Sequence, residues 1–314
     1  MSYSLEGKRV WVAGHAGMVG SALMRRLAKE NCTLLTAERS ELDLLSQGAV
    51  RRWLEDYAPD AIFLAAARVG GILANSRRPA DFLYDNLVIE TNIIEAAAQL
   101  EVEKLLFLGS SCIYPRLASQ PIREEELLTG PLEETNQWYA IAKIAGIKLC
   151  QAFRRQDGCD FISAMPTNLY GPGDNFDLET SHVLPALIRK VHEAKTGGAR
   201  SITIWGSGTP RREFLHVDDC ADALVFLMQH YSNESHINVG CGEDLTIREL
   251  AELVCEVVGF SGKIETDPER PDGTPRKLLN VDRLAAMGWQ KKIPLRAGIA
   301  ATYEWYEGNQ LLTN

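Results

Sequence analysis

Long hydrophobic runs are absent from this sequence. No uninterrupted apolar stretch in its 314 residues is long enough to span a bilayer, and the first seven residues lack the apolar core of a signal peptide. The seven cysteines also lack a metal-type spacing, and their odd number favours buried or functional thiols over a disulfide framework. We therefore expect a cytoplasmic protein that has no membrane partner and holds no metal.

Basic charge is scarce as well. The chain has 33 Lys and Arg residues against 42 Asp and Glu residues, which gives a net charge of -9. General nucleic-acid binding relies on a basic surface that displaces counterions, so this balance argues against a nucleic-acid partner and requires any anion site to be local. With 46% hydrophobic and 24% charged residues, the composition is typical of a soluble metabolic enzyme with one large or two modest cores.

A glycine-rich segment, GHAGMVG at residues 14–20, is the first strong functional signal. It directly follows a strand-like run at residues 8–13 and opens a helix-like run at residues 18–29. Strand-like runs at residues 33–36 and 60–67 complete a β-α-β pattern. This context favours a dinucleotide-binding turn over an ordinary connection between a strand and a helix.

Each glycine of this segment has a physical reason. Gly14 permits the tight turn, Gly17 lets the backbone approach a pyrophosphate, and Gly20 allows close helix packing. The N-terminus of the helix presents unpaired amides to the anion. The cofactor-binding residues predicted here are Gly14, His15, Ala16, Gly17, Met18, Val19 and Gly20.

The end of the second strand bears on the choice between NAD and NADP. An acidic residue there would bind the adenosine 2'-hydroxyl, whereas an arginine accommodates a 2'-phosphate. This chain has Arg39 at that position, with Glu38 beside it. Glu38 could serve the hydroxyl instead, and a surface arginine is a common alternative. We expect NADPH as the cofactor.

Strand-like and helix-like runs continue to alternate at residues 104–109, 139–156 and 160–165. This order predicts an α/β fold with a doubly wound parallel sheet of the Rossmann type. The regular alternation stops after residue 173, where loops rich in glycine and proline and a helix at residues 182–194 begin a second, smaller region.

The same pattern suggests how the chain divides into domains. We expect residues 1–168 to form the dinucleotide-binding domain and residues 169–314 to form mainly the substrate-binding domain. Segments near residues 214–240 should return to the first domain, because residues 237–240 read as a strand that can join its sheet.

Tyr139 and Lys143 stand four residues apart in a helix-permissive segment, so one helical face can carry both side chains. Such a pair can move a proton at a carbonyl. An adjacent ammonium favours the ionised phenol, and we expect it to bring the pKa of Tyr139 within reach of acid–base work near neutrality. Taken alone, the spacing also fits an ordinary solvated helix pair.

Four longer segments carry a family resemblance: GSSCIYP at residues 109–115, YAIAKIAG at 139–146, MPTNLYGP at 165–172 and REFLHVDD at 212–219. With the glycine-rich segment, they resemble the extended short-chain dehydrogenase/reductase family that acts on nucleotide sugars, over essentially the whole chain. The resemblance implies an enzyme that epimerises C3 and C5 of GDP-4-keto-6-deoxy-D-mannose and then reduces its C4 ketone with NADPH, giving GDP-L-fucose.

The resemblance implies five catalytic residues. In the reduction, Tyr139 donates a proton to the developing alkoxide, Ser110 hydrogen-bonds the same oxygen, and Lys143 holds the phenol and the nicotinamide ribose. Epimerisation needs two further proton carriers, and Cys112 and His182 match the base and the acid of the family. Outside those motifs, the ordinary interpretations are a small buried hydrophobe for Cys112 and a satisfied loop histidine for His182.

The resemblance also assigns ligand contacts. Beyond the glycine-rich segment, the cofactor residues are Arg39, Leu44, Leu108, Gly109, Ser110, Ser111, Lys143, Pro166, Thr167, Asn168, Leu169 and His182. The substrate residues are Asn168, Lys190, Trp205, Arg212, Asp272 and Lys277. Solvated surface charges remain alternatives for Lys277 and Asp272, as does a core role for Trp205.

Three positions depart from the family pattern. Ala16 stands where some relatives have an arginine directed at the 2'-phosphate, which leaves Arg39 as the chief phosphate contact and softens the preference for NADPH. Lys190 stands where other members have arginine, with Arg189 next to it as a substitute. Trp138 is bulkier than the usual neighbour of the tyrosine, and the sequence offers no physical account of it.

Alternatives to this activity stay open. One is a reductase that does not epimerise, another is a C5 epimerase and C4 reductase of the GDP-colitose branch, and a third, of a different class, is a dinucleotide sensor without turnover. The oligomeric state that is usual in the family also predicts a homodimer, in which helices near residues 81–100 and 136–156 pair across a twofold axis.

Overall fold

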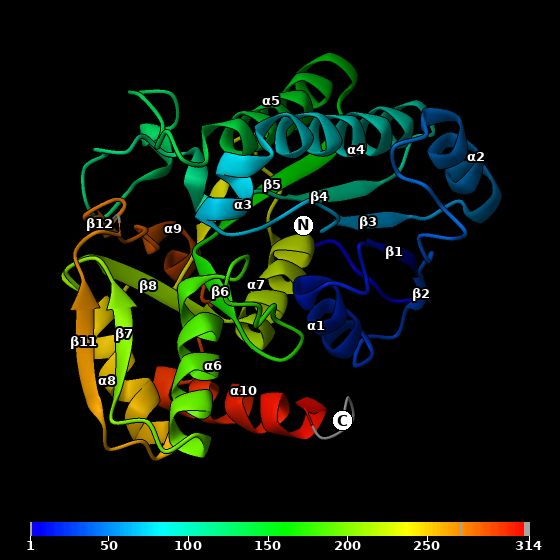
Figure 1. Ribbon diagram of the computed structural model, residues 1–314. Helices are drawn as coiled ribbons and strands as arrows, with labels where there is room; N and C mark the ends of the chain where they lie inside the picture. The colour runs from blue at the N-terminus through cyan, green and yellow to red at the C-terminus, as the bar shows by residue number, and fades with distance from the viewer. Residues whose placement is uncertain (1, 271, 311–314) are drawn as a thin grey trace.

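The computed structural model describes residues 2–270 and 272–310 and is built around a six-stranded parallel sheet with helices on both faces (Figure 1). The strand order is β2-β1-β3-β4-β5-β9. The strands are β1 (Arg9–Ala13), β2 (Thr33–Leu35), β3 (Ala61–Leu64), β4 (Lys104–Leu108), β5 (Asp160–Pro166) and β9 (Ile237–Val239). The prediction of a doubly wound parallel sheet is confirmed.

Helices cover the two faces of this sheet. On one face lie α2 (Gln47–Tyr57), α4 (Pro79–Gln99) and α5 (Gln137–Asp157), and on the other lie α1 (Met18–Leu27) and α7 (Val217–His230) (Figure 1). Because both faces are covered, the central strands are almost continuously hydrophobic rather than alternating, and all four residues of β3 are buried.

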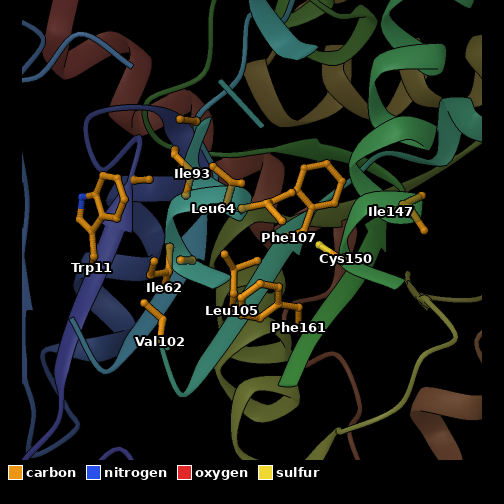
Figure 2. Close-up of a cluster of buried hydrophobic side chains, with 14 of the residues drawn as sticks. Trp11, Ile62, Leu64, Ile93, Val102, Leu105, Phe107, Ile147, Cys150 and Phe161 are labelled. Carbon is orange, nitrogen blue, oxygen red and sulfur yellow. The ribbon is translucent and has the colours of Figure 1, made fainter. Parts of the chain in front are cut away.

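An apolar core lies between the large sheet and the helices α4 and α5, and it holds α5 in place. Figure 2 shows Leu105 and Phe107 of β4 packed with Ile93 of α4 and Ile147 of α5, and the four side chains are completely buried. A truncation of such a side chain typically costs ~2–5 kcal/mol. This packing fixes the position of α5, which carries Tyr139 and Lys143.

The remaining strands form two small sheets. Strand β8 (Arg211–His216) pairs with β6 (Asn168–Tyr170), β10 (Asp244–Thr246) and β12 (Arg276–Lys277), and β7 (Ser201–Trp205) pairs with β11 (Lys263–Asp267). A separate hydrophobic cluster joins these strands to the helices α6 (Val183–Thr196), α8 (Ile247–Val258) and α10 (Leu295–Gln310). The short elements are α3 (Ile72–Arg77), α9 (Asp282–Ala286) and the 3-10 turns η1 (Ser111–Ile113) and η2 (Glu124–Glu126).

The two parts of the chain are interleaved. After β8, helix α7 packs on α1, and β9 then pairs in parallel with β5, where Ala164 faces Ile237. The chain leaves the large sheet again to form β10 and α8.

The strand order of the large sheet contains a topological switch point beside β1. Strands β2 and β3 lie on opposite sides of β1. Successive strands are therefore added to the sheet in one direction before this point and in the other direction after it. In open α/β sheets, ligands bind at such a switch point, beside the carboxyl ends of the strands. Among the residues that the structure describes, no helix is long and apolar enough to cross a membrane.

Candidate active site

The glycine-rich turn after β1 forms a cradle with no room for side chains. Gly14 has a φ of +88°, and a Cβ there would lie 2.7 Å from the Ala66 backbone. A Cβ on Gly20 would collide with the Gly14 carbonyl, so α1 can pack this closely only on glycine. Gly17 caps α1 without a side-chain hydrogen bond, which leaves the first-turn amides of the helix available to an anion. These features fit a dinucleotide pyrophosphate.

Glu38 and Arg39, beside this cradle, differ in whether their side chains already have a partner. The His15 Nε2 atom lies 3.1 Å from the Glu38 Oε1 atom, so the carboxylate is already engaged. Arg39 is exposed and has no hydrogen-bond or ion-pair partner among residues 2–270 and 272–310. Its guanidinium is therefore free to meet a 2'-phosphate, whereas Ala16 contributes no charge.

The carboxyl end of β4 carries the first catalytic candidates. Gly109 follows the strand, and Ser110 in extended conformation caps η1 and accepts a hydrogen bond of 3.3 Å from the Cys112 amide. Because the Ser110 oxygen accepts this bond, its proton remains available to another oxygen. The turn buries Cys112, which is only 7% exposed.

Tyr139 and Lys143 occupy one face of α5, and Lys143 does not act on the phenol as expected. The Lys143 Nζ atom lies 2.8 Å from the Glu90 Oε1 atom, and both side chains are buried. Burial raises the pKa of Tyr139 well above its usual range, and Cys112 and Glu90 raise it further. The expectation that Lys143 brings this pKa near neutrality is therefore wrong, because burial disfavours the ionised phenol. Tyr139 is a neutral phenol.

Lys277 stands beside Cys112 rather than at a distant phosphate site. Both side chains line one small cavity together with Ser111, Glu133 and Asn136. Burial raises the pKa of Cys112, whereas the Lys277 ammonium opposes that rise. Burial also lowers the pKa of Lys277. Burial is the larger effect, so the pKa of Cys112 lies above its ordinary value.

His182 caps the N-terminus of α6 and leaves part of its ring open to solvent. The surrounding protein and, to a smaller extent, the Lys277 ammonium lower the pKa of His182 below its usual range. Lys277 thus interacts electrostatically with both Cys112 and His182. The two predicted proton carriers face the same lysine from different elements, η1 and α6.

Lys190 and Trp205 lie together on the substrate side. The Lys190 Nζ atom is 5.5 Å from the centre of the Trp205 ring and donates a hydrogen bond to the Thr203 carbonyl oxygen. Arg189, the neighbour that could substitute for an arginine at position 190, has its Nε atom 2.7 Å from the Glu193 carboxylate. Arg270 brings another cation, and its guanidinium is 5.0 Å from the centre of the Trp205 ring.

The other predicted substrate residues are held by their neighbours. Asp272 accepts hydrogen bonds from the amide and the hydroxyl of Ser207, at 2.7 and 2.9 Å. Burial lowers the pKa of Arg212, whose guanidinium bonds to the Arg211 carbonyl oxygen. The Asn168 side chain donates to the Glu213 carbonyl oxygen at 2.8 Å, which ties β6 to β8.

The remaining cofactor candidates occupy the same edge of the large sheet, with one exception. Leu108 ends β4 and Ser111 begins η1, while Pro166 ends β5 and Thr167 leads to Leu169 in β6. Leu44 lies in the loop after β2, where its carbonyl accepts a hydrogen bond of 2.9 Å from Asn92 of α4.

Sequence reasoning missed Glu90 and Arg270. Glu90 lies in α4, so only the packing of α4 on α5 brings it to Lys143. The sequence around Glu90 carries no clear signal, because Asn86 and Asn92 of the same helix are buried polar residues as well. Arg270 precedes the PDGTPRK segment in a loop, and nothing in its spacing indicates that it stacks on Trp205.

The sequence is similar to that of known proteins over most of its length. Residues 10–240 match the family model described as "NAD dependent epimerase/dehydratase family". A protein of Sinorhizobium fredii named GDP-L-fucose synthase is 62% identical over 98% of each chain. A GDP-L-colitose synthase of Yersinia pseudotuberculosis is 37% identical, over 95% of this chain and 97% of its own.

A solved structure also matches. It is a GDP-L-fucose synthetase of Naegleria fowleri bound to NADP, with a TM-score of 0.90 and 28% identity, covering 99% of this chain and 97% of that one. The chain belongs to the NAD dependent epimerase/dehydratase family.

The exposed Arg39 leads to a test of cofactor selectivity. Arg39→Ala should raise the KM for NADPH about tenfold to a hundredfold, since a charge-assisted hydrogen bond is worth ~1.5–3 kcal/mol. The KM for NADH should change little. Steady-state kinetics with both cofactors measure the difference. Arg51→Ala on α2, which removes an exposed ion pair with Glu55, serves as the control. An equal effect on both cofactors would make Arg39 a mere surface residue.

Proposed function

We propose that this protein converts GDP-4-keto-6-deoxy-D-mannose to GDP-L-fucose in two steps, epimerisation at C3 and C5 followed by NADPH-dependent reduction at C4. One observation carries the proposal: the buried thiol of Cys112 lies close enough to the Tyr139 phenol to influence its ionisation, at the same strand end as Ser110. A proton base therefore shares one pocket with the groups that stabilise a ketone oxygen.

The reduction uses the triad on β4 and α5. When bound, NADPH supplies the hydride. Tyr139, kept neutral by burial, donates its proton to the C4 oxygen, and the free proton of Ser110 hydrogen-bonds the same oxygen. Lys143 orients the phenol from the next turn of the helix, with its ammonium 5.7 Å from the centre of the Tyr139 ring.

Epimerisation uses the same oxygen-binding groups and two further proton carriers. The hydrogens at C3 and C5 are acidic because the C4 carbonyl can become an enolate, which Tyr139 and Ser110 stabilise. Cys112 removes a proton from the ring and His182 returns one to the opposite face. Lys277 supports the thiolate that Cys112 must form, so we assign it to the epimerisation centre in addition to substrate binding.

The substrate and the cofactor divide between the two parts of the chain. We assign the dinucleotide to residues 1–168, with the cradle at residues 14–20 and Arg39 as its chief contacts. Residues 169–314 contribute most of the GDP-sugar site, although the last four lie outside the described residues. There, Lys190, Arg212 and Arg270 supply local positive charge in an acidic protein, and Trp205 offers its ring to the nucleoside.

The alternative activities fit less well. A reductase without epimerisation has no use for a Cys112 and a His182 that both interact with Lys277. The colitose relative is 37% identical, against 62% for the fucose relative. A dinucleotide sensor without turnover has no need of a complete Ser110, Tyr139 and Lys143 triad.

We also propose a homodimer built from α4 and α5, which lie side by side on the same face of the sheet (Figure 1). Tyr84 of α4 is 65% exposed, and Trp138 and Ile141 of α5 are each 40% exposed. A twofold pairing of these helices would cover all three and would explain the bulky Trp138.

The seven cysteines are free thiols, as expected of a protein of the reducing cytoplasm.

Product analysis tests the proposed reaction. The enzyme is incubated with GDP-4-keto-6-deoxy-D-mannose and NADPH in deuterated water, and the product is characterised by NMR. We expect GDP-L-fucose with deuterium at both C3 and C5, because each inversion draws a proton from solvent. Deuterium at C5 alone would support the colitose-type reaction, and a reduced sugar without deuterium would refute epimerisation.

Two variants should separate the steps. Cys112→Ser should lose at least ~100-fold in the exchange of solvent deuterium into C3 and C5, because a serine hydroxyl is a far weaker acid than a thiol and does not form the anion that acts as the base. Tyr139→Phe should lower NADPH oxidation by ~100-fold to 10,000-fold, because the proton donor is missing. Mass spectrometry of the sugar and absorbance at the cofactor band measure these rates. A Cys112→Ser protein with normal exchange would remove the thiol from the mechanism.

The proposed dimer can be tested by placing a charged side chain at the centre of its interface. Trp138→Glu should shift the protein from dimer to monomer in sedimentation velocity, because a carboxylate would be buried without a partner. Leu117→Glu, at a residue that is 83% exposed and outside α4 and α5, should leave the dimer intact. Identical sedimentation of wild type and Trp138→Glu would contradict this interface.

A further inference from the structure

A small cavity lies beside Cys112, between three parts of the chain. Cys112 comes from η1, Lys277 from β12, and Glu133 and Asn136 from the segment that leads into α5. The volume of the cavity is about 30 Å³. Pockets for small molecules typically measure ~300–1,000 Å³, so this one is far too small for a sugar ring. A water molecule needs only ~10–15 Å³, so the cavity has room for water.

The wall of the cavity includes a buried polar group that water would satisfy. Asn136 is the N-cap of α5, where an asparagine side chain usually accepts a hydrogen bond from the first turn of the helix. It makes no such bond. Its Oδ1 atom is buried and has no hydrogen-bond partner among residues 2–270 and 272–310. Buried waters typically bond to polar groups that are otherwise unsatisfied, so Asn136 marks the cavity as a site for ordered water.

Glu133 connects this cavity with the protein surface. Its Oε2 atom lies 3.3 Å from the Nε atom of Arg116, and the two side chains are 16% and 49% exposed. The same oxygen accepts a hydrogen bond of 3.4 Å from the Thr274 hydroxyl. Cys112, in contrast, is 7% exposed. The wall of the cavity therefore runs from a buried thiol to a carboxylate that touches solvent.

Lys277 interacts electrostatically with both ends of this wall. Burial lowers the pKa of Lys277, while Cys112 and Glu133 oppose that change. The ammonium in turn opposes the burial that raises the pKa of Cys112. The lysine therefore favours a negative charge on the sulfur at the moment when the thiol proton leaves.

The proposed epimerisation requires a way out for that proton. Each inversion moves a proton from the sugar ring to Cys112, and the same residue cannot act on the second carbon until this proton has left. Tyr139 and Ser110 cannot take it, because both bind the ketone oxygen. The sugar ring itself covers the side of the sulfur that it meets. The proton must therefore leave Cys112 on another side.

We propose that the cavity is the proton exit of the epimerisation: water in the cavity takes the proton from the Cys112 thiol and delivers it to the Glu133 carboxylate, which releases it to solvent. This role rests on the proposed two-step reaction. The S–H bond breaks and leaves its electron pair on sulfur, an O–H bond forms on Glu133, and loss of that proton to solvent restores the carboxylate. Nothing is oxidised or reduced.

The relay is fast enough even though a carboxylate is a weaker base than a thiolate. Each unit by which the pKa of the donor exceeds that of the acceptor slows a proton transfer about tenfold. From a ceiling of ~6 × 10¹² s⁻¹, a difference of ~5 units still leaves ~6 × 10⁷ s⁻¹, against a typical kcat of ~10 s⁻¹. With the carboxylate in place the exit is not rate-limiting, and without it the exit should become so.

Exchange without reduction tests the proton exit. The protein is incubated with NADP⁺ and GDP-4-keto-6-deoxy-D-mannose in deuterated water, and deuterium at C3 and C5 is followed by mass spectrometry. Glu133→Gln and Glu133→Ala should each slow this exchange by at least ~10-fold, and Glu133→Asp should keep most of it. Asn136→Leu, which keeps Glu133 but lines the cavity with an apolar side chain, should slow it as well.

Rescue by an added base separates proton transfer from a structural role. Glu133→Ala leaves space for a small carboxylate, so formate should restore its exchange rate in proportion to the formate concentration. Formate should leave the wild-type rate unchanged. Arg116→Met is the matched control, because it breaks the same ion pair but keeps the carboxylate. Glu134→Gln removes the neighbouring exposed carboxylate. Both control variants should exchange at the wild-type rate.

The reverse of the reduction shows whether the variants are intact. Oxidation of GDP-L-fucose by NADP⁺ involves hydride transfer but no inversion, so its first turnover should be the same in wild type and in the Glu133 variants. If exchange and oxidation fall by the same factor in Glu133→Gln, the residue is structural and the proton exit is refuted.

The remaining outcomes separate this proposal from the proposed reaction. If the wild type neither exchanges deuterium nor oxidises GDP-L-fucose, the reaction itself is refuted. If the wild type exchanges deuterium and Glu133→Gln does so at the same rate, the proton exit is refuted and the reaction stands. The same conclusion follows if Glu133→Ala is slow and formate does not restore it.

Discussion

The site depends on one constraint of parallel sheets, which is that all the strands end at the same edge. Strand β1 ends at the glycine cradle, β4 at Ser110, and β5 leads into Asn168. The reversal of strand order beside β1 opens this edge to a ligand. Helix α5 then supplies Tyr139 and Lys143 from the covered face, because the apolar core between β4 and α5 fixes the distance of the helix from the edge.

Much of this arrangement could be predicted from the sequence because its signals are local. The glycine spacing at residues 14–20 and the buried runs of β1, β3, β4 and β5 each depend on neighbours within a few positions, and the structure has the corresponding elements close to the expected bounds. The face shared by Tyr139 and Lys143 follows from helical periodicity alone. The return of β9 to the large sheet was also visible as a strand-like run.

What the sequence could not provide is the electrostatic state of the site. The pKa of Tyr139 depends first on burial and then on Cys112 and Glu90, and Glu90 is 49 positions earlier in the chain and meets α5 only through tertiary packing. The same holds for Lys277, which reaches Cys112 because β12 pairs with β8, and for Arg270, which reaches Trp205 through a loop. Helical spacing predicted which side chains share a face, but not which charges would be compensated.

The two lysines of the pocket therefore differ in their electrostatic surroundings. Lys143 forms a buried ion pair with Glu90, and burial is the main reason why the pKa of Tyr139 is raised. The Lys277 ammonium opposes the burial that raises the pKa of Cys112. Pairs of titratable groups whose environments push their pKa values apart are the usual mark of acid and base assignments. In the proposed mechanism Tyr139 is the acid and Cys112 the base, so the two groups can serve one ketone without exchanging roles.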